Sequence, residues 1–390
     1  MTTAKQKALR FVVSLGLVSL FADFTYEGGR SIVGPFLASL GASAFFAGAV
    51  AGFGEFLGYA IRLFSGRLVD RTRKDWLILS LGYVVNLASV PLMAFAPNSI
   101  VAGALVFSER LGKGVRAPAR DALLAKAGRE LGHGKAFGLH EFLDQLGAVL
   151  GPLAVSAAVA YSGYRLGFGI LVVPAIVAWL FLWWASGIGN AESKAGRGAT
   201  RTKFDKRYYL YLAFSVVTVL GFTHNILYAY HLQYTHRLSS STIPLMFAFT
   251  MGVDAVAALG FGWLYDRYGL KVLMALPLFT VPATPLLFLS PSPELIWLGG
   301  GLWGAAMGLQ DATMRSGVAT LTPENIRGTA YGVFDAVFGT AWLIGSLLLG
   351  WLYGVSPQAL VIAAVMFQIA ALPLLFLTLR GLPKQRQKSG

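Results

Sequence analysis

The chain has 390 residues, of which 56% are hydrophobic and 13% are charged, and its mean hydropathy is +0.63. In a soluble domain roughly a quarter of the residues are charged, so this composition excludes an ordinary soluble protein and predicts an integral membrane protein. The chain has no cysteine, which excludes disulfides, thiolate metal sites and cysteine nucleophiles.

Apolar runs of about 20 residues recur along the chain, and each is long enough to cross a hydrocarbon core of ~30 Å as a helix. We predict twelve spans, centred near residues 24, 54, 86, 110, 148, 175, 220, 252, 280, 305, 342 and 368. Residues 5 to 22 begin with basic side chains, as a signal peptide does, but no small-residue cleavage site follows them. We therefore expect a retained first helix.

The net charge of +14 is unevenly placed along this topology. Of the 32 Lys and Arg residues, 23 fall on one side of the predicted membrane, two (Arg165 and Arg237) on the other and seven within spans. Because cytoplasmic loops are enriched in Lys and Arg, we expect both termini in the cytoplasm of a multi-pass protein of the cell inner (plasma) membrane. The positive net charge is thus explained by the orientation of the chain in the membrane, and no nucleic-acid partner is expected.

Three charges lie within eight residues of the first span, in FADFTYEGGRSIVGPF at residues 21 to 36. A charge at a helix centre costs roughly 2.5 to 3.5 kcal/mol in lipid. At 100° per residue, Asp23, Glu27 and Arg30 fall within about 60° of one another, and Tyr26 lies beside them. We expect this polar face to line a water-accessible cavity and to be partly paired with other helices.

The next spans add further charges. On the second span, Glu55 and Arg62 are seven residues apart, and we expect them to pair with each other. The fourth span carries a basic stripe at three- and four-residue spacing, with one acid in the same sector: Arg110, Lys113, Arg116, Arg120 and Glu109. The fifth span carries two acids beside His140.

Buried carboxylates in these spans are candidates for proton coupling. A low-dielectric surrounding disfavours the charged form of a carboxylate, so protonation can be linked to a ligand or a conformation, and a nearby cation opposes this. The proton-coupling candidates are Asp23, Glu27, Glu109, Arg110, Glu141 and Asp144.

The second half of the chain is less charged. His224 and Tyr228 share a face of the seventh span, and Asp311 and Arg315 on the tenth form an i, i+4 pair that can satisfy itself. For Arg30 the alternative to a substrate contact is pairing with an acid, and for His224 it is hydrogen-bonded packing. The candidates for a substrate cavity are Tyr26, Arg30, Lys113, Arg116, His224, Tyr228 and Asp311. No spacing resembles a metal site, and no cofactor is expected.

Two sequence pairs indicate an internal repeat. GRLVDRTRKDW at residue 66 matches GWLYDRYGLKV at 262, and GKAFGLHEF at 134 matches GTAYGVFDA at 328, with shifts of 196 and 194 residues. We predict a tandem duplication, with a six-helix bundle over residues 1–190, a cytoplasmic linker over 191–206 and a second six-helix bundle over 207–390. Transporters use such parallel repeats, with the substrate site near the membrane midplane.

The repeated loop motif resembles the G-x-L-a-D-r-x-G-r-k signature of the major facilitator superfamily. The copy at Gly262, Leu264, Asp266, Arg267, Gly269 and Lys271 is more complete than the copy at Gly66, Leu68, Asp70 and Arg71, which has Arg73 in place of the second glycine. ERLGKGVRAPA in the fourth span resembles the family's R-x-x-q-G-x-g-a pattern, and GAVLGP in the fifth resembles the first half of the drug/proton antiporter signature.

This resemblance implies an all-α membrane fold of twelve helices, in two pseudo-symmetric halves around a central cavity lined by spans 1, 4, 7 and 10. It places the acidic face of the first span opposite or beside the basic stripe of the fourth. It also implies a monomer, and a charge cluster that latches the cytoplasmic side of the halves. The gate residues carried over are Gly66, Asp70, Arg71, Asp121, Gly262, Asp266 and Arg267.

The function expected from these features is secondary active transport by alternating access, with small organic molecules exported in exchange for protons. One alternative is a proton-coupled symporter of an anionic solute, bound by the cations of the fourth span. Another is a membrane receptor or assembly factor on a transporter scaffold. The sequence has no P-loop and no G-x-S-x-G nucleophile elbow, so no enzyme or ATP-driven pump is expected.

Overall fold

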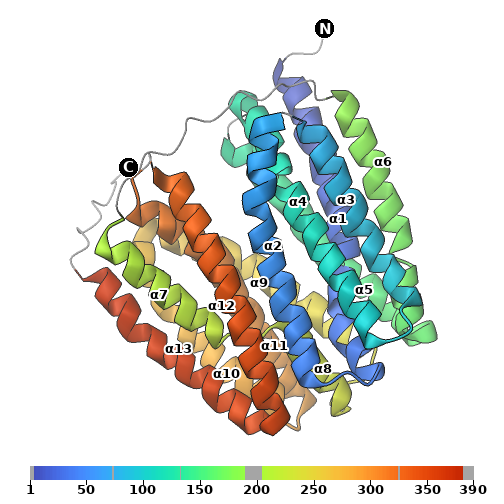
Figure 1. Cartoon of the computed structure of the whole chain (residues 1–390), viewed down its shortest axis with the longest axis vertical. Helices are drawn as coiled ribbons and strands as arrows, with labels where there is room; N and C mark the ends of the chain where they lie inside the picture. The colour runs from blue at the N-terminus through green and yellow to red at the C-terminus, as the bar shows by residue number, and fades with distance from the viewer. Residues whose placement is uncertain (1–3, 73, 132, 189–203, 324–325, 381–390) are drawn as a thin grey trace. The chain divides into compact units, whose positions relative to one another are not determined.

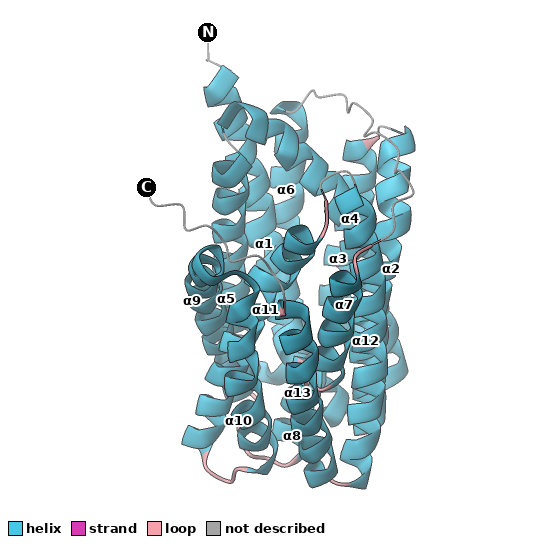
Figure 2. Cartoon of the chain, turned by 90° about the vertical axis from the view of Figure 1, so that its left-hand side faces the viewer, coloured by secondary structure: helices cyan, strands magenta, loops and turns pink. Residues whose placement is uncertain are grey.

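The computed structural model describes residues 4–72, 74–131, 133–188, 204–323 and 326–380. These residues are helical apart from short connections, and no strand occurs among them (Figures 1 and 2). The α-helices are α1 (Ala4–Ser39), α2 (Ala44–Thr72), α3 (Asp75–Leu92), α4 (Ser99–Leu131), α5 (His133–Gly169), α6 (Val172–Ile188), α7 (Lys206–Leu220), α8 (Asn225–Tyr234), α9 (Thr242–Tyr268), α10 (Leu276–Leu289), α11 (Pro293–Leu321), α12 (Arg327–Val355) and α13 (Pro357–Leu379). Two 3-10 segments, η1 (Met93–Phe95) and η2 (Gly269–Ala275), follow α3 and α9.

Within the described part of the chain, eight segments are long and apolar enough to cross a membrane. Three of them, Gly138–Ile188, Lys206–Tyr234 and Thr242–Leu289, each cover parts or all of two α-helices. The long helices α4 and α11 are not among the eight, and α4 is the helix that carries the basic stripe. The structure thus confirms an all-helical membrane protein, while the count of twelve spans stays a prediction.

The chain divides into two compact units. Unit 1 comprises residues 1–42, 53–197 and 233–248, and unit 2 comprises residues 43–52, 198–232 and 249–390. The linker expected at 191–206 lies almost entirely outside the described residues. The apolar core of unit 1 lies between α1, α3, α4 and α6, and includes Leu15, Leu79, Leu87, Leu123 and Leu182.

Glycines set the closest helix contacts in unit 1. A Cβ atom on Gly147 or Gly151 of α5 would overlap the backbone carbonyl oxygen of Leu20 or Phe24 of α1. A Cβ on Gly82 of α3 would lie 2.7 Å from the Cβ of Arg116 on α4. Small residues let helix backbones approach in a membrane, so these pairs of helices are held at fixed, short separations.

The predicted seventh span is interrupted. Helix α7 ends at Leu220, α8 begins at Asn225, and residues 221–224 are not helical. Gly221 weakens the helix at this point, and the Nδ1 atom of His224 accepts a hydrogen bond from the backbone N–H of Ile226 at 3.2 Å. This local bond satisfies a free N–H in the first turn of α8.

Candidate functional site

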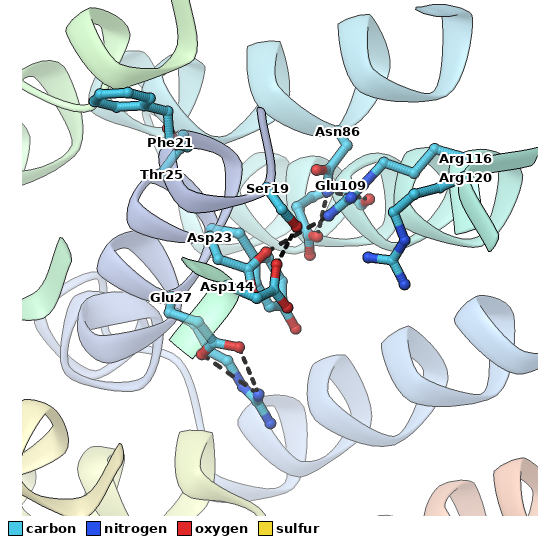
Figure 3. Close-up of polar contacts among 12 residues, drawn as sticks. Ser19, Phe21, Asp23, Thr25, Glu27, Asn86, Glu109, Arg116, Arg120 and Asp144 are labelled. Carbon is cyan, nitrogen blue, oxygen red and sulfur yellow. Dashed lines mark hydrogen bonds and ion pairs between the residues drawn. The ribbon is translucent and has the colours of Figure 1, made fainter. Parts of the chain in front are cut away.

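Charged side chains gather in unit 1, where α1, α2, α4 and α5 contribute acids and bases to one cluster. Figure 3 shows part of it, with Asp23 and Glu27 of α1, Glu109 and Arg116 of α4 and Asp144 of α5. Asp23, Glu27, Glu109 and Arg116 are all buried. The two charged faces predicted on the first and fourth spans therefore meet, and we call this group the charge cluster.

Arg110 joins three helices of the charge cluster. Its Nη2 atom lies 3.0 Å from Oε1 of Glu55 on α2, and its Nε atom lies 3.4 Å from Oε2 of Glu109 on α4. Its Nη1 atom donates a hydrogen bond to the hydroxyl of Tyr26 on α1. Gly54 leaves room for the stem, since a Cβ there would lie 3.2 Å from the Cγ of Arg110. Arg110 is only 5% exposed, so its positive charge depends on these partners.

Arg30 links α1 to the same acid of α2. Its Nη1 atom lies 3.3 Å from Oε1 of Glu27, and its Nη2 atom lies 3.8 Å from Oε1 of Glu55. The structure therefore supports the pairing alternative for Arg30. The predicted pair of Glu55 with Arg62 is replaced by ion pairs to Arg30 and Arg110, and the Arg62 guanidinium lies over the Tyr59 ring at 5.1 Å.

Lys113 lies against an aromatic ring. Its Nζ atom is 3.6 Å from the centroid of the Tyr26 ring, in the range of a cation–π interaction. Among the described residues no carboxylate forms an ion pair with Lys113. Lys113 is partly exposed, so its ammonium is an accessible cation of the charge cluster that forms no close ion pair within the described part of the chain.

Arg116 is the most buried cation of the charge cluster, with 1% of its surface exposed. Its Nη2 atom lies 3.7 Å from Oδ1 of Asp23, and its guanidinium lies over the Tyr83 ring of α3 at 4.4 Å. Its Nε and Nη1 atoms have no hydrogen-bond partner within the described part of the chain. Arg116 is thus enclosed by α1, α3 and α4, and its contact with a substrate stays a prediction.

The remaining acids of the charge cluster have neutral hydrogen-bond partners. The hydroxyl of Ser19 on α1 donates to Oδ1 of Asp144 on α5 (Figure 3). The Nδ2 atom of Asn86 on α3 donates to Oε1 of Glu109 at 2.7 Å. Glu141, one turn from Asp144, is exposed. Ser19 and Asn86 were missed, although each had a signal: Ser19 shares a face of α1 with Asp23, and Asn86 is a lone amide in an apolar span.

The first copy of the family signature lies at the end of α2, and Asp121 lies within α4. Gly66 and Arg71 lie in the last turns of α2, and the side chain of Asp70 lies outside the described ones. Asp121 pairs with Arg120 at 3.0 Å. Near this end of unit 1, Lys126 of α4 pairs with Asp75 of α3 at 2.8 Å, a contact between residues 51 apart that no local pattern could reveal.

In unit 2 the second copy of the signature ends α9. Gly262 and Asp266 lie in its last two turns, and the Arg267 guanidinium lies 5.9 Å from the Trp263 ring and 5.6 Å from the Tyr268 ring. Gly269 has a φ of 59°, a left-handed conformation that favours glycine. The second glycine of the motif is therefore explained by a turn, and Arg73 at the matching place of the first copy is outside the described residues.

The polar residues of unit 2 predicted to line a cavity lie beside aromatic rings. The His224 ring is 5.4 Å from Trp342, and the Tyr228 ring is 5.4 Å from Trp303, whose Nε1 atom donates to the Thr223 carbonyl at 2.8 Å. Asp311 is exposed.

Arg315 of α11, which we expected to pair with Asp311, contacts a second helix. Its Nη2 atom lies 2.9 Å from Oδ2 of Asp335 on α12, and its pair with Asp311 stays a prediction. The described residues also include no group of three or more His, Asp or Glu side chains that could hold a metal ion.

Comparisons with known proteins place the chain in a family. The family model described as Major Facilitator Superfamily matches residues 15–213 and 210–390. Uncharacterized protein Rv2265 of Mycobacterium tuberculosis is 39% identical over 380 residues, which cover 95% of this chain and 93% of that protein. Multidrug resistance protein MdtH of Proteus mirabilis is 28% identical over 191 residues, or 48% of this chain and 46% of that protein.

The fold has solved neighbours of the same architecture. The crystal structure of nucleoside transporter NupG aligns with a TM-score of 0.74 at 13% identity, covering 94% of this chain and 98% of that one. This likeness concerns the fold alone. Since the family model covers nearly the whole chain in two matches and the described part is a multi-pass helical membrane protein, the chain belongs to the Major Facilitator Superfamily and is a transporter of that family.

Proposed function

We propose that this chain is a secondary active transporter that works by alternating access and exports small organic molecules in exchange for protons. The observation that carries the proposal is the charge cluster, in which buried acids depend on cations that they share. Ionisable side chains within a membrane are costly and mark ion or proton pathways in transporters. Purely structural packing of α1 against α4 would be served by apolar side chains at lower cost.

The cluster holds nearly equal numbers of acids and cations, which supports coupling to protons. Its carboxylates Asp23, Glu27, Glu55, Glu109 and Asp144 lie among the cations Arg30, Arg110, Lys113, Arg116 and Arg120, of which Arg120 is also paired with Asp121. Binding one proton makes the site more positive by one charge. A cationic substrate and a proton would then compete for the site, which is the requirement for exchange.

The direction and substrate class rest on similarity. A relative that matches 48% of this chain is named as a multidrug resistance protein, and GAVLGP resembles part of the antiporter signature. We also propose the finer features of the architecture: twelve spans in two pseudo-symmetric halves, residues 1–190 and 207–390, in a monomer of the inner membrane with both termini cytoplasmic. The biased placement of Lys and Arg supports this orientation.

A second candidate function is proton-coupled symport of an anionic solute, and Lys113 favours it. Its partly exposed ammonium has the Tyr26 ring as its contact and no carboxylate ion pair in the described chain. An anionic group of a substrate is a stronger partner for an ammonium than an aromatic face. In this candidate the proton neutralises an acid of the charge cluster while the anion binds Lys113.

One titration tests both candidates. Purified protein in weak buffer is mixed with lipophilic cations, neutral drugs and organic anions while a pH electrode records protons. We expect cations or neutral drugs to release protons from the wild type and not from Glu27→Gln, because the variant loses an acid of the charge cluster that holds the substrate while it displaces the proton. If anions instead cause proton uptake, and Lys113→Gln loses this uptake, the result would favour anion symport over export. A response that is equal in wild type and Glu27→Gln would remove Glu27 from the mechanism.

A further inference from the structure

We propose that Asp23 of α1 and Asp144 of α5 share a single proton, and that this carboxyl pair is the site where the exchanged proton is bound. Its role in transport rests on the proposed function, whereas the sharing of the proton does not. The proposal selects two acids from the six proton-coupling candidates and gives them one joint role. We call them the carboxyl pair.

The packing of α1 against α5 brings the carboxyl pair together. Ser19 and Asp23 are one turn apart on α1, and Ser19 donates a hydrogen bond to Asp144. Gly147, one turn beyond Asp144, rests on the backbone of Leu20 with no room for a Cβ. The two carboxylates therefore enter the same interhelical space, and Figure 3 shows them side by side, in agreement with the direct electrostatic interaction between them.

Two carboxylates in one buried space cannot both be ionised at low cost. Like charges that share a low-dielectric space repel each other, so a single proton held between the two carboxyl groups is the favourable state. Such a pair titrates as a unit and not as two independent acids. Asp23 is 7% exposed, so water does little to screen this repulsion.

The cations of α4 around the carboxyl pair favour its ionised state, and Glu141 opposes it. Lys113, Arg116 and Arg120 of α4 act on Asp23, and Arg120, Arg116 and Glu141 act on Asp144. Glu27 lies one turn further along α1 and is paired with Arg30. Helix α3 contributes the phenol of Tyr83, and α6, which also packs on α1, has no charged residue.

Arg116 is the independent sign that the pair changes its charge. Its guanidinium is 1% exposed and points at Asp23, yet its nearest approach is 3.7 Å and two of its donor atoms, Nε and Nη1, have no acceptor among the described residues. A buried donor without an acceptor is costly. When the carboxyl pair loses its shared proton, both carboxylates are negative, and the Nε and Nη1 atoms of Arg116 then have a second anionic acceptor nearby. The position of Arg116 therefore favours the deprotonated state of the pair.

Proton access follows the same face of α5. Glu141 is exposed, Asp144 is half-buried one turn away, and Asp23 is buried across the interface. The three acids form a series of decreasing exposure from the surface to the carboxyl pair. We expect the proton to enter and leave past Glu141, with Ser19 keeping Asp144 oriented towards Asp23.

Infrared spectroscopy of the purified protein without substrate tests the shared proton. The protonated carboxyl has a carbonyl band that shifts in D2O. At neutral pH we expect the wild type to show a band from buried protonated acids, and we expect Asp23→Asn and Asp144→Asn each to remove the same part of it, the share of one carboxyl. The double variant should lose no more than either single variant. Glu294→Gln, at an exposed helix start in unit 2, is the matched control and should keep the band.

The outcomes separate sharing from independent protonation. If the losses of the two single variants add in the double variant, the acids are independent and the proposal is wrong. A band unaffected by the double variant would also overturn it. Ser19→Ala keeps both acids and should shift the band frequency without changing its area, which tests the pair even where an Asn variant fails to fold. This test measures no transport, so its result can be interpreted even if the export proposal fails.

Discussion

Arg110→Gln is expected to be the most destabilising single change in the charge cluster, at about 3 to 5 kcal/mol. Removing one member of a buried ion pair leaves its partner as an uncompensated buried charge. Arg110 is the 3.0 Å partner of Glu55 and the 3.4 Å partner of Glu109, and it also donates to Tyr26. The substitution therefore affects two acids and disconnects α4 from α1 and α2.

Thermal unfolding in detergent, followed by tryptophan fluorescence, measures this effect. Arg110→Lys should recover part of the loss, because it keeps the charge but lacks the guanidinium geometry. Arg315→Gln is the matched control, since it breaks an arginine–aspartate pair in which the arginine side chain is 55% exposed, and exposed pairs contribute about 0 to 1 kcal/mol. Equal unfolding temperatures for Arg110→Gln and Arg315→Gln would contradict the claim that Arg110 holds α1, α2 and α4 together in the charge cluster.

Gly147→Ala is expected to abolish proton-linked activity and to destabilise the chain by about 1 to 3 kcal/mol or more. Its added methyl group would overlap the Leu20 carbonyl, which is backbone and can yield only if α1 moves away from α5. That movement separates Ser19 and Asp23 from Asp144. A single methyl group thus tests whether the close approach of these helices holds the charges in register.

The control for this change is a glycine without a neighbour. A Cβ on Gly260 of α9 meets no described atom within 4 Å, and alanine is a better helix former than glycine by about 0.5 to 1 kcal/mol. Gly260→Ala should therefore leave the unfolding temperature unchanged or raise it. Proton release on ligand addition should persist in Gly260→Ala and vanish in Gly147→Ala. Full release in Gly147→Ala would show that the helix contact tolerates a methyl group.

The sequence predicted the membrane environment, the helices and the family, because these depend on local properties of the chain. The length of the apolar runs is set by the thickness of the bilayer, and the repeated loop motif is recognised from its residue types alone. The polar face of Asp23, Glu27 and Arg30 followed from helical periodicity alone, and the structure confirms that it meets the basic stripe of α4.

The partners within the site were harder to predict, because they depend on how helices rotate and slide against one another. Glu55 pairs with Arg30 and Arg110 of other helices and not with Arg62 of its own. Arg315 pairs with Asp335 of α12. Spacing within one helix could predict neither of these contacts between helices. The role of these residues in transport stays a prediction.

The most direct test of the central claim uses the protein in liposomes that contain a pH-sensitive dye. With a lipophilic cation at high concentration on one side only, the account predicts that protons move towards the side that holds the substrate, and that Asp23→Asn stops this flux. Substrate movement without any proton flux would contradict proton exchange. Absence of any solute movement, in protein shown to be folded, would favour the receptor or assembly-factor alternative.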